Sequence, residues 1–268
     1  MKRTIKLTKR DYLVLWYSWQ CRFLAVRQLR RLFWEDASIE AARARLKDLC
    51  DAGYLGSETF PVGRDRTLYF STRAGNRVLV DGGMKTAEIE FDFPRRPQEM
   101  TRTLDHDLRV IDIRIALEET GVIPISWHSD HELRKNRGQY AGPNTRVPDG
   151  IFEWEVSKVR YPGVLEYEHQ RYNPDRWPDI LRRLYYTYTD FTVFLVCRTA
   201  ERVKSATAAV KRARVYSYEP EKFYVCDFDS VDAKGLRAGF VDLEGKPFTL
   251  VDPSRKKSEQ NAESKLDQ

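Results

Sequence analysis

The chain has 268 residues, of which 41% are apolar, so it is long enough to form one large or two ordinary domains with their own cores. Its four cysteines lie far apart, which argues against a disulfide framework or a zinc site. No apolar run approaches the roughly 18 residues that cross a bilayer, which argues against a signal peptide or a membrane span. Together these features favour the cytoplasm. The net charge of +6 is uneven: residues 1–80 hold 16 basic and 8 acidic side chains, so they carry +8 and the remainder carries −2.

Three short helices are predicted at the N-terminus. Thr8 is a suitable N-cap for the first helix, with Asp11 in the capping-box position. A second helix is predicted over 25–34 from its periodic apolar residues. Ser38 caps a third helix, which Gly53 ends. These helices predict a compact tri-helical unit.

A β-hairpin is predicted directly after the helices. Two β-prone runs, 54–60 and 67–71, flank a turn with a basic tip, and a short helix follows over 72–80. Three helices followed by a hairpin indicate a winged helix-turn-helix domain over residues 1–82. Residues 83–100, which contain glycine and proline clusters, are predicted to be a linker.

The second domain, residues 101–251, is predicted to have the element order α-β-β-β-α-β. The predicted elements are a helix over 103–120, strands over 122–128, 147–154 and 163–168, a helix around 177–188, a strand over 191–197, a helix over 200–213 and a strand over 222–228. The predicted fold class is therefore α/β, or α+β for the whole chain. Residues 252–268 are too polar to bury a core and are predicted to be a disordered tail.

The basic residues of the winged helix predict contact with double-stranded DNA. In this kind of domain the third helix enters the major groove and the wing meets the neighbouring backbone. The predicted DNA-binding residues are Arg43, Arg45 and Lys47 on the third helix and Arg64 and Arg66 at the wing tip. Two alternatives remain open: the winged helix contacts proteins, or the charges are an ordinary solvated surface.

Three carboxylates in the second domain form a candidate metal site. Glu166 and Glu168 alternate along one strand and so share a face, beside the end of the strand that bears Asp149. Such a cluster suits Mg²⁺, which prefers oxygen ligands and assists phosphodiester cleavage. The alternative is that these residues are exposed strand-edge acids beside an ordinary turn. No nucleotide-binding glycine loop or Ser-His-Asp arrangement is present. We therefore predict no cofactor, or Mg²⁺ if the carboxylate cluster is active.

The second domain resembles the PD-(D/E)XK nuclease superfamily. The resemblance rests on the α-β-β-β-α-β order with Pro148-Asp149 followed by Glu166-Tyr167-Glu168. It implies a restriction-endonuclease-like fold in which Asp149 and Glu166 are metal ligands. Glu168 stands where that superfamily has a lysine, which normally orients the attacking water and offsets negative charge. The resemblance therefore implies a degenerate nuclease-like domain, with Asp149, Glu166 and Glu168 as catalytic and metal-binding residues only if the domain is active.

Most of the chain, up to about residue 200, resembles the replication-relaxation family of plasmid and mobile-element proteins. The motifs that carry this resemblance are Leu7-Thr8-Lys9-Arg10-Asp11, Gln28-Leu29, Ala44-Arg45-Leu46, Asp51-Ala52-Gly53-Tyr54-Leu55, Ser71-Thr72-Arg73-Ala74-Gly75 and Leu104-Asp105-His106-Asp107-Leu108. The resemblance implies a DNA-binding protein that acts in replication control or transcription regulation. The alternatives are a Mg²⁺-dependent DNA endonuclease and an adaptor for a replication or conjugation protein. A homodimer is left open.

Overall fold

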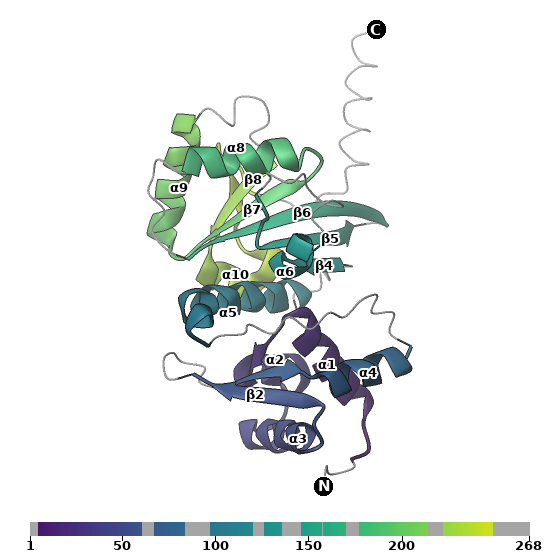
Figure 1. Ribbon diagram of the computed structural model, residues 1–268. Helices are drawn as coiled ribbons and strands as arrows, with labels where there is room; N and C mark the ends of the chain where they lie inside the picture. The colour runs from purple at the N-terminus through teal and green to yellow at the C-terminus, as the bar shows by residue number, and fades with distance from the viewer. Residues whose placement is uncertain are drawn as a thin grey trace. The chain divides into compact units, whose positions relative to one another are not determined.

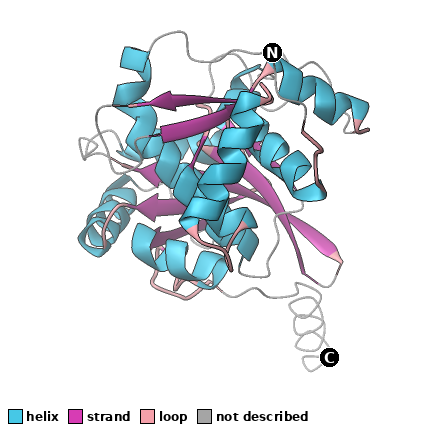
Figure 2. Cartoon of the chain, turned by 90° about the horizontal axis from the view of Figure 1, so that it is seen from below, coloured by secondary structure: helices cyan, strands magenta, loops and turns pink. Residues whose placement is uncertain are grey.

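The computed structural model divides into two compact units, Met1–Ile115 and Ala116–Gln268. It describes residues 5–60, 67–83, 97–119, 126–135, 146–156, 158–169, 177–213 and 222–248. Figure 1 labels most of the helices and strands of the two units, and Figure 2 colours helices and strands differently. Within these ranges no helix has the length and apolar content that a membrane span requires. The predicted mixed α/β fold class is confirmed.

The helices of the first unit begin where the capping residues predict. Helix α1 spans Lys9–Gln20 behind a complete capping box between Thr8 and Asp11. Helix α2 covers Val26–Phe33, and α3 covers Ile39–Asp51 behind a Ser38 side chain that accepts from the Ala41 amide. A positive φ of 80° at Gly53 follows the end of α3. This conformation favours glycine because a side chain would clash there.

A three-stranded antiparallel sheet completes this arrangement. Its strand order is β1-β3-β2, formed by Leu24–Ala25, Thr67–Ser71 and Leu55–Thr59. The two-residue strand β1 is an element that helical periodicity alone does not predict. Helix α4, Arg73–Asp81, follows β3. The order of helices and strands is that of the predicted winged helix, while the wing tip lies outside the described residues.

Helix α5, Pro97–Glu119, extends the core of the first unit. Its apolar residues Leu104, Leu108, Ile111 and Ile115 pack in one cluster with the side chains of α1, α2 and α3. We predicted this helix to belong wholly to the second domain. The division between the units instead falls within α5, and the predicted linker is shortened because residues 97–100 are helical.

A buried polar network attaches α5 to α2. The Arg27 guanidinium donates to both carboxylate oxygens of Asp112, at 2.6 and 2.8 Å, and Gln28 Nε2 donates to Asp112 Oδ1 at 2.8 Å. The same amide nitrogen donates to the Leu108 carbonyl, while Gln28 Oε1 accepts from the Ala25 amide. Gln28 and Asp112 are both buried. These hydrogen bonds satisfy polar groups that would otherwise be costly to bury.

The second unit is built on a six-stranded mixed sheet with strand order β4-β5-β6-β7-β8-β9. Strands β6, β7 and β8 are parallel to one another, and the remaining neighbours are antiparallel. Its strands are Ser126–Ser129, Gly150–Val156, Val159–Glu168, Thr192–Cys197, Phe223–Asp227 and Val241–Asp242. Its helices beyond α5 are α6 Asp130–Lys135, α8 Trp177–Thr187, α9 Ala200–Ala213 and α10 Phe228–Lys234, with a 3₁₀ turn at Gly235–Arg237. The predicted order α-β-β-β-α-β is present, with the additional short helix α6.

Different side chains line the two faces of this sheet. Helices α8 and α9 lie over one face, whereas α10 lies on the other (Figure 1). The apolar core beneath α8 and α9 includes Leu181, Leu184, Val193 and Leu195. Because side chains alternate along a strand, the intervening residues face the α10 side, where Phe194 contacts several aromatic rings. The central strand β7 is therefore buried on both faces.

Substitution of Asp112 tests the network between α2 and α5. We expect Asp112→Ala to lower the free energy of unfolding by about 2–4 kcal/mol, because it removes the buried carboxylate that accepts from Gln28 Nε2 and from the Arg27 guanidinium. The expected loss is smaller than for a fully buried ion pair because the Arg27 side chain is 40% exposed. Urea unfolding of the full chain measures this change. Thr103→Ala, at an exposed position of the same helix, is the control and is expected to cost less than about 0.5 kcal/mol. Equal losses in the two variants would contradict a stabilising role for the network.

Candidate DNA-binding surface and carboxylate cluster

One face of α3 is buried and the opposite face is exposed. Ala42, Leu46 and Leu49 lie in the core of the first unit. Arg43 and Lys47, four residues apart, lie together on the exposed face. Ala44 is also exposed, so a small side chain stands beside the two basic ones. A helix surface of this kind allows long cations to reach outward while the backbone approaches a ligand closely.

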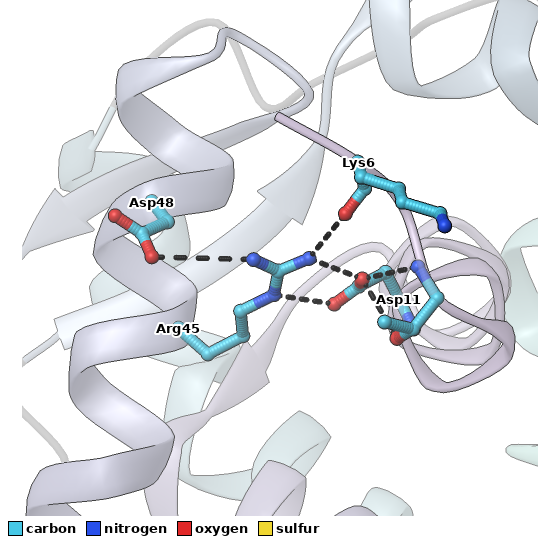
Figure 3. Close-up of polar contacts among 5 residues, drawn as sticks. Lys6, Asp11, Arg45 and Asp48 are labelled. Atoms are coloured by element: carbon cyan, nitrogen blue, oxygen red, sulfur yellow. Dashed lines mark hydrogen bonds and ion pairs between the residues drawn. The ribbon is translucent and has the colours of Figure 1, made fainter. Parts of the chain in front are cut away.

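The third basic residue of α3 points inward (Figure 3). Arg45 donates through Nε to Asp11 Oδ1 at 2.9 Å and through Nη2 to Asp11 Oδ2 at 2.5 Å. Nη2 also donates to the Lys6 carbonyl at 3.0 Å. The Asp11 side chain is fully buried and that of Arg45 is 26% exposed. This bidentate pair joins the first turn of α1 to the middle of α3.

The same carboxylate completes the cap of α1. Asp11 Oδ2 accepts from the Thr8 amide at 2.7 Å and from the Thr8 hydroxyl at 2.8 Å. Burial acts to raise the pKa of Asp11, but the hydrogen bonds from Arg45 and Thr8 and the charge of Arg45 outweigh it and hold this pKa below its ordinary value. Asp11 is therefore an ionised, buried acceptor that several donors stabilise.

Arg45, which we predicted to contact DNA, therefore joins α3 to α1. It lies three residues after Ala42 and four before Leu49, at the edge of the buried face of α3. Helical periodicity placed it outside the core, but it did not reveal the carboxylate at this edge. The capping-box role of Asp11 was predicted from the sequence, whereas its contact with a residue 34 positions away was not.

The other predicted DNA-binding residues differ in what the structure describes. Lys47 donates to Asp51 at 2.6 Å, and both side chains are well exposed, at 73% and 43%. Such a surface pair is weak and exchanges readily for another anion. Arg43 lies near enough to the phenol of Tyr69 on β3 for its charge to affect the pKa of that phenol. Burial is the main cause of the raised Tyr69 pKa, and the positive charge of Arg43 partly opposes this rise. Arg64 and Arg66 lie outside the described residues.

The carboxylate cluster of the second unit lies where β5 and β6 meet. Gly150 pairs with Leu165, so the preceding residue Asp149 lies beside Glu166. Asp149 Oδ2 accepts from the Tyr167 amide at 2.7 Å, and the Asp149 amide donates to the Leu165 carbonyl. Asp149 is therefore fixed to the strand segment that carries both predicted glutamates.

The absence of a side chain at Gly150 allows this segment to pack. A Cβ at Gly150 would lie 2.6 Å from the indole ring of Trp127 on β4. The ring therefore occupies the space above the residue that follows Asp149. A glycine after the predicted metal-ligand aspartate is thus explained by packing as well as by turn formation.

Each glutamate is paired with an arginine that sequence reasoning did not identify. Glu166 Oε1 accepts from Arg146 Nη2, and Glu168 Oε1 accepts from Arg202 Nη1 at 2.8 Å. The glutamate side chains are only 1% and 5% exposed, so they are not exposed strand-edge acids. One topological signal was available for Arg202: β6 and β7 are parallel, so the end of β6 and the helix that follows β7 meet at one edge of the sheet.

The residues present do not fit the predicted Mg²⁺ site. A divalent ion of this kind requires several oxygen ligands around an open centre. Within the ranges that the structure describes, no three His, Cys, Asp or Glu side chains are grouped to hold a metal ion. Two guanidinium groups, which repel cations, contact the glutamates instead. The expected ligands Asp149, Glu166 and Glu168 thus belong to a hydrogen-bonded and ion-paired cluster.

A buried thiol lies next to this cluster. Cys197 on β7 pairs in register with Glu168 on β6. Burial is the main cause of a strongly raised Cys197 pKa, and the neighbouring charge of Glu168 raises it further. The thiol is therefore neutral near pH 7, which argues against a nucleophilic role for it.

Comparisons with known proteins identify the family. The two units define a mixed α/β protein in which a helical unit with a small sheet precedes a unit with a mixed sheet. The chain belongs to the replication-relaxation family, whose model matches residues 20–183, more than half of its length. The predicted family is therefore confirmed. A search of curated proteins finds no match.

Two solved structures have a low overall similarity to the chain. One is the restriction endonuclease FokI, with 14% identity and a TM-score of 0.31, covering 87% of this chain and 46% of that one. The other is FokI bound to DNA, with 13% identity and a TM-score of 0.28, covering 90% of this chain and 48% of that one. This chain thus spans about half the length of those proteins.

Asp11→Asn tests the buried ion pair of the first unit. We expect a loss of about 3–5 kcal/mol in the free energy of unfolding at pH 7, because Arg45 loses the buried carboxylate that accepts two of its hydrogen bonds and keeps only Asp48, at 4.0 Å, as a charged partner. Asp51→Asn removes the acid of the exposed pair with Lys47 and serves as the control, with an expected loss below about 1 kcal/mol. Urea unfolding measures both.

The pH dependence of this difference has a definite sign. The pKa of Asp11 is lower in the folded protein than its ordinary value of 3.8. The stability that ionised Asp11 contributes is therefore fully present above pH 3.8, and it is lost as the pH falls through the folded-state pKa. The wild type and Asp11→Asn should therefore converge in stability only below about pH 4. A difference that disappears between pH 5 and 7 would be inconsistent with an ionised Asp11.

Proposed function

We propose that the first unit binds double-stranded DNA and that α3 enters the major groove. The observation that carries this proposal is the exposed face of α3, on which Arg43 and Lys47 project outward while Arg45 is tied to Asp11. Arginine recognises guanine or phosphate through paired hydrogen bonds, and lysine contributes a point charge to phosphate. Arg43 is therefore the proposed base-reading residue and Lys47 a phosphate-binding one.

The charge distribution supports a polyanionic partner. Residues 1–80 carry a net charge of +8, whereas the rest of the chain is slightly acidic. A basic first unit attracts the DNA backbone over long distances and raises the rate of association at low salt. The proposed wing residues Arg64 and Arg66 contribute to this positive charge. Phosphate contacts from the wing would fix the register of α3 in the groove.

The family supports a biological role for this binding. Replication-relaxation is the description of the family to which the chain belongs. We propose that the protein acts in the replication control of a plasmid or mobile element, or in transcription regulation, as a DNA-binding factor. The protein-interaction adaptor remains the principal alternative, and it predicts no measurable DNA affinity at physiological salt. The Mg²⁺-dependent endonuclease is disfavoured by the arginines that contact Glu166 and Glu168.

Two substitutions on α3 test the proposed DNA contacts. We expect Arg43→Ala to weaken binding to the preferred duplex by about 1–3 kcal/mol and to relax its sequence preference. Lys47→Ala should weaken binding to all duplexes similarly and reduce the slope of log affinity against log salt by about 1. Fluorescence anisotropy with labelled duplexes over a range of salt concentrations measures both effects.

The matched control is Arg183→Ala, which removes an exposed arginine from α8 of the second unit. This variant has the same change in net charge as Arg43→Ala, so it separates a local contact from a general electrostatic effect. Equal affinity for DNA in Arg43→Ala, Lys47→Ala and the wild type would exclude α3 as the interface. No binding by the wild type at physiological salt would favour the adaptor.

A further inference from the structure

We propose that the carboxylate cluster of the second unit is a metal-independent ion-pair network, in which Arg146 and Arg202 balance the charge that a divalent cation would balance in a nuclease. The proposal goes beyond DNA binding by the first unit, and it starts from the disagreement between these residues and a Mg²⁺ site. It assigns the two arginines a role in holding the second unit together.

The charges of the cluster require compensation inside the protein. Glu166 and Glu168 lie on the same face of β6 and are almost completely buried. An ionised carboxylate is unfavourable in such a place unless a cation and hydrogen-bond donors accompany it. Arg146 and Arg202 supply both, one to each glutamate, and their side chains remain 27% and 23% exposed. The guanidinium groups thus reach the buried acids from the surface.

The fold places both arginines at this position. Arg202 lies in the first turn of α9, which follows β7, and β7 is parallel to β6, so α9 begins at the edge where Glu168 lies. Arg146 precedes β5 by four residues, on the segment that leads into Asp149. The network therefore links α9, β6 and the segment before β5. Its members come from three separate parts of the sequence.

The remaining oxygens do not provide a divalent site. Asp149 Oδ2 accepts from the Tyr167 amide. Glu166 Oε2 is buried and accepts no hydrogen bond from any residue that the structure describes. The other oxygen of that carboxylate is bound by Arg146, and Glu168 likewise has one oxygen bound by Arg202 and a buried Oε2. A divalent cation at Glu166 would have to displace the Arg146 guanidinium. A preformed metal site instead holds its oxygen ligands ready for the ion.

Thermal unfolding of the full chain tests the proposal without a cleavage assay. The wild type is followed by circular dichroism in EDTA, in millimolar Mg²⁺ and in millimolar Mn²⁺. We expect the same midpoint in all three solutions. A midpoint that rises with either metal, and a rise that Asp149→Asn abolishes, would overturn the proposal because it would reveal a working metal site.

Substitution of Arg202 tests the ion pair itself. We expect Arg202→Met to lower the midpoint by roughly 5 °C or more, because Glu168 is left buried without its cation. Lys204→Met, at an exposed position of the same helix, is the control and should change it little. Equal midpoints in these two variants would also overturn the proposal. If Arg202→Met does not fold, the double variant Glu168→Gln with Arg202→Met is expected to recover a folded protein, since it removes both charges.

Discussion

The position of α3 depends on the burial of one charge, the carboxylate of Asp11. An ionised group inside a protein costs several kcal/mol unless donors surround it, and here Thr8 and Arg45 provide four of them. Thr8 donates from the cap of α1, whereas Arg45 donates from the middle of α3. The same charge therefore starts the first helix and fixes the third against it. Because Arg45 is held inward, the outward face of α3 is left to Arg43 and Lys47.

Both units use buried acids in this way. In the first unit, Asp112 on α5 accepts from Arg27 and Gln28 on α2, which extends the helical core beyond the small sheet. In the second unit, buried glutamates of β6 accept from arginines that precede β5 or begin α9. Each pair joins elements that are distant in sequence. The apolar cores are thus accompanied by long-range ion pairs, which determine which elements pack together.

The sequence predicts the elements well and the polar pairs poorly. Capping at Thr8 and Ser38 fixes two helix starts, and the apolar runs locate the central strands, because both signals are local. A charged partner is chosen by the tertiary fold, so neither Arg45 nor Arg202 was predicted to bind an acid. The resemblance to a nuclease singled out Asp149, Glu166 and Glu168. It did not predict that arginines contact this cluster.

Site-specific photo-crosslinking tests the central claim, that the exposed face of α3 meets DNA. A photoreactive amino acid replaces Ala44, which is exposed beside Arg43, or Ala208, which is exposed on α9 of the second unit. Full-length protein is irradiated with labelled duplex DNA at physiological salt. The account predicts a protein–DNA adduct from position 44 and little or none from position 208. An adduct from position 208 alone, or equal yields from both positions, would contradict it.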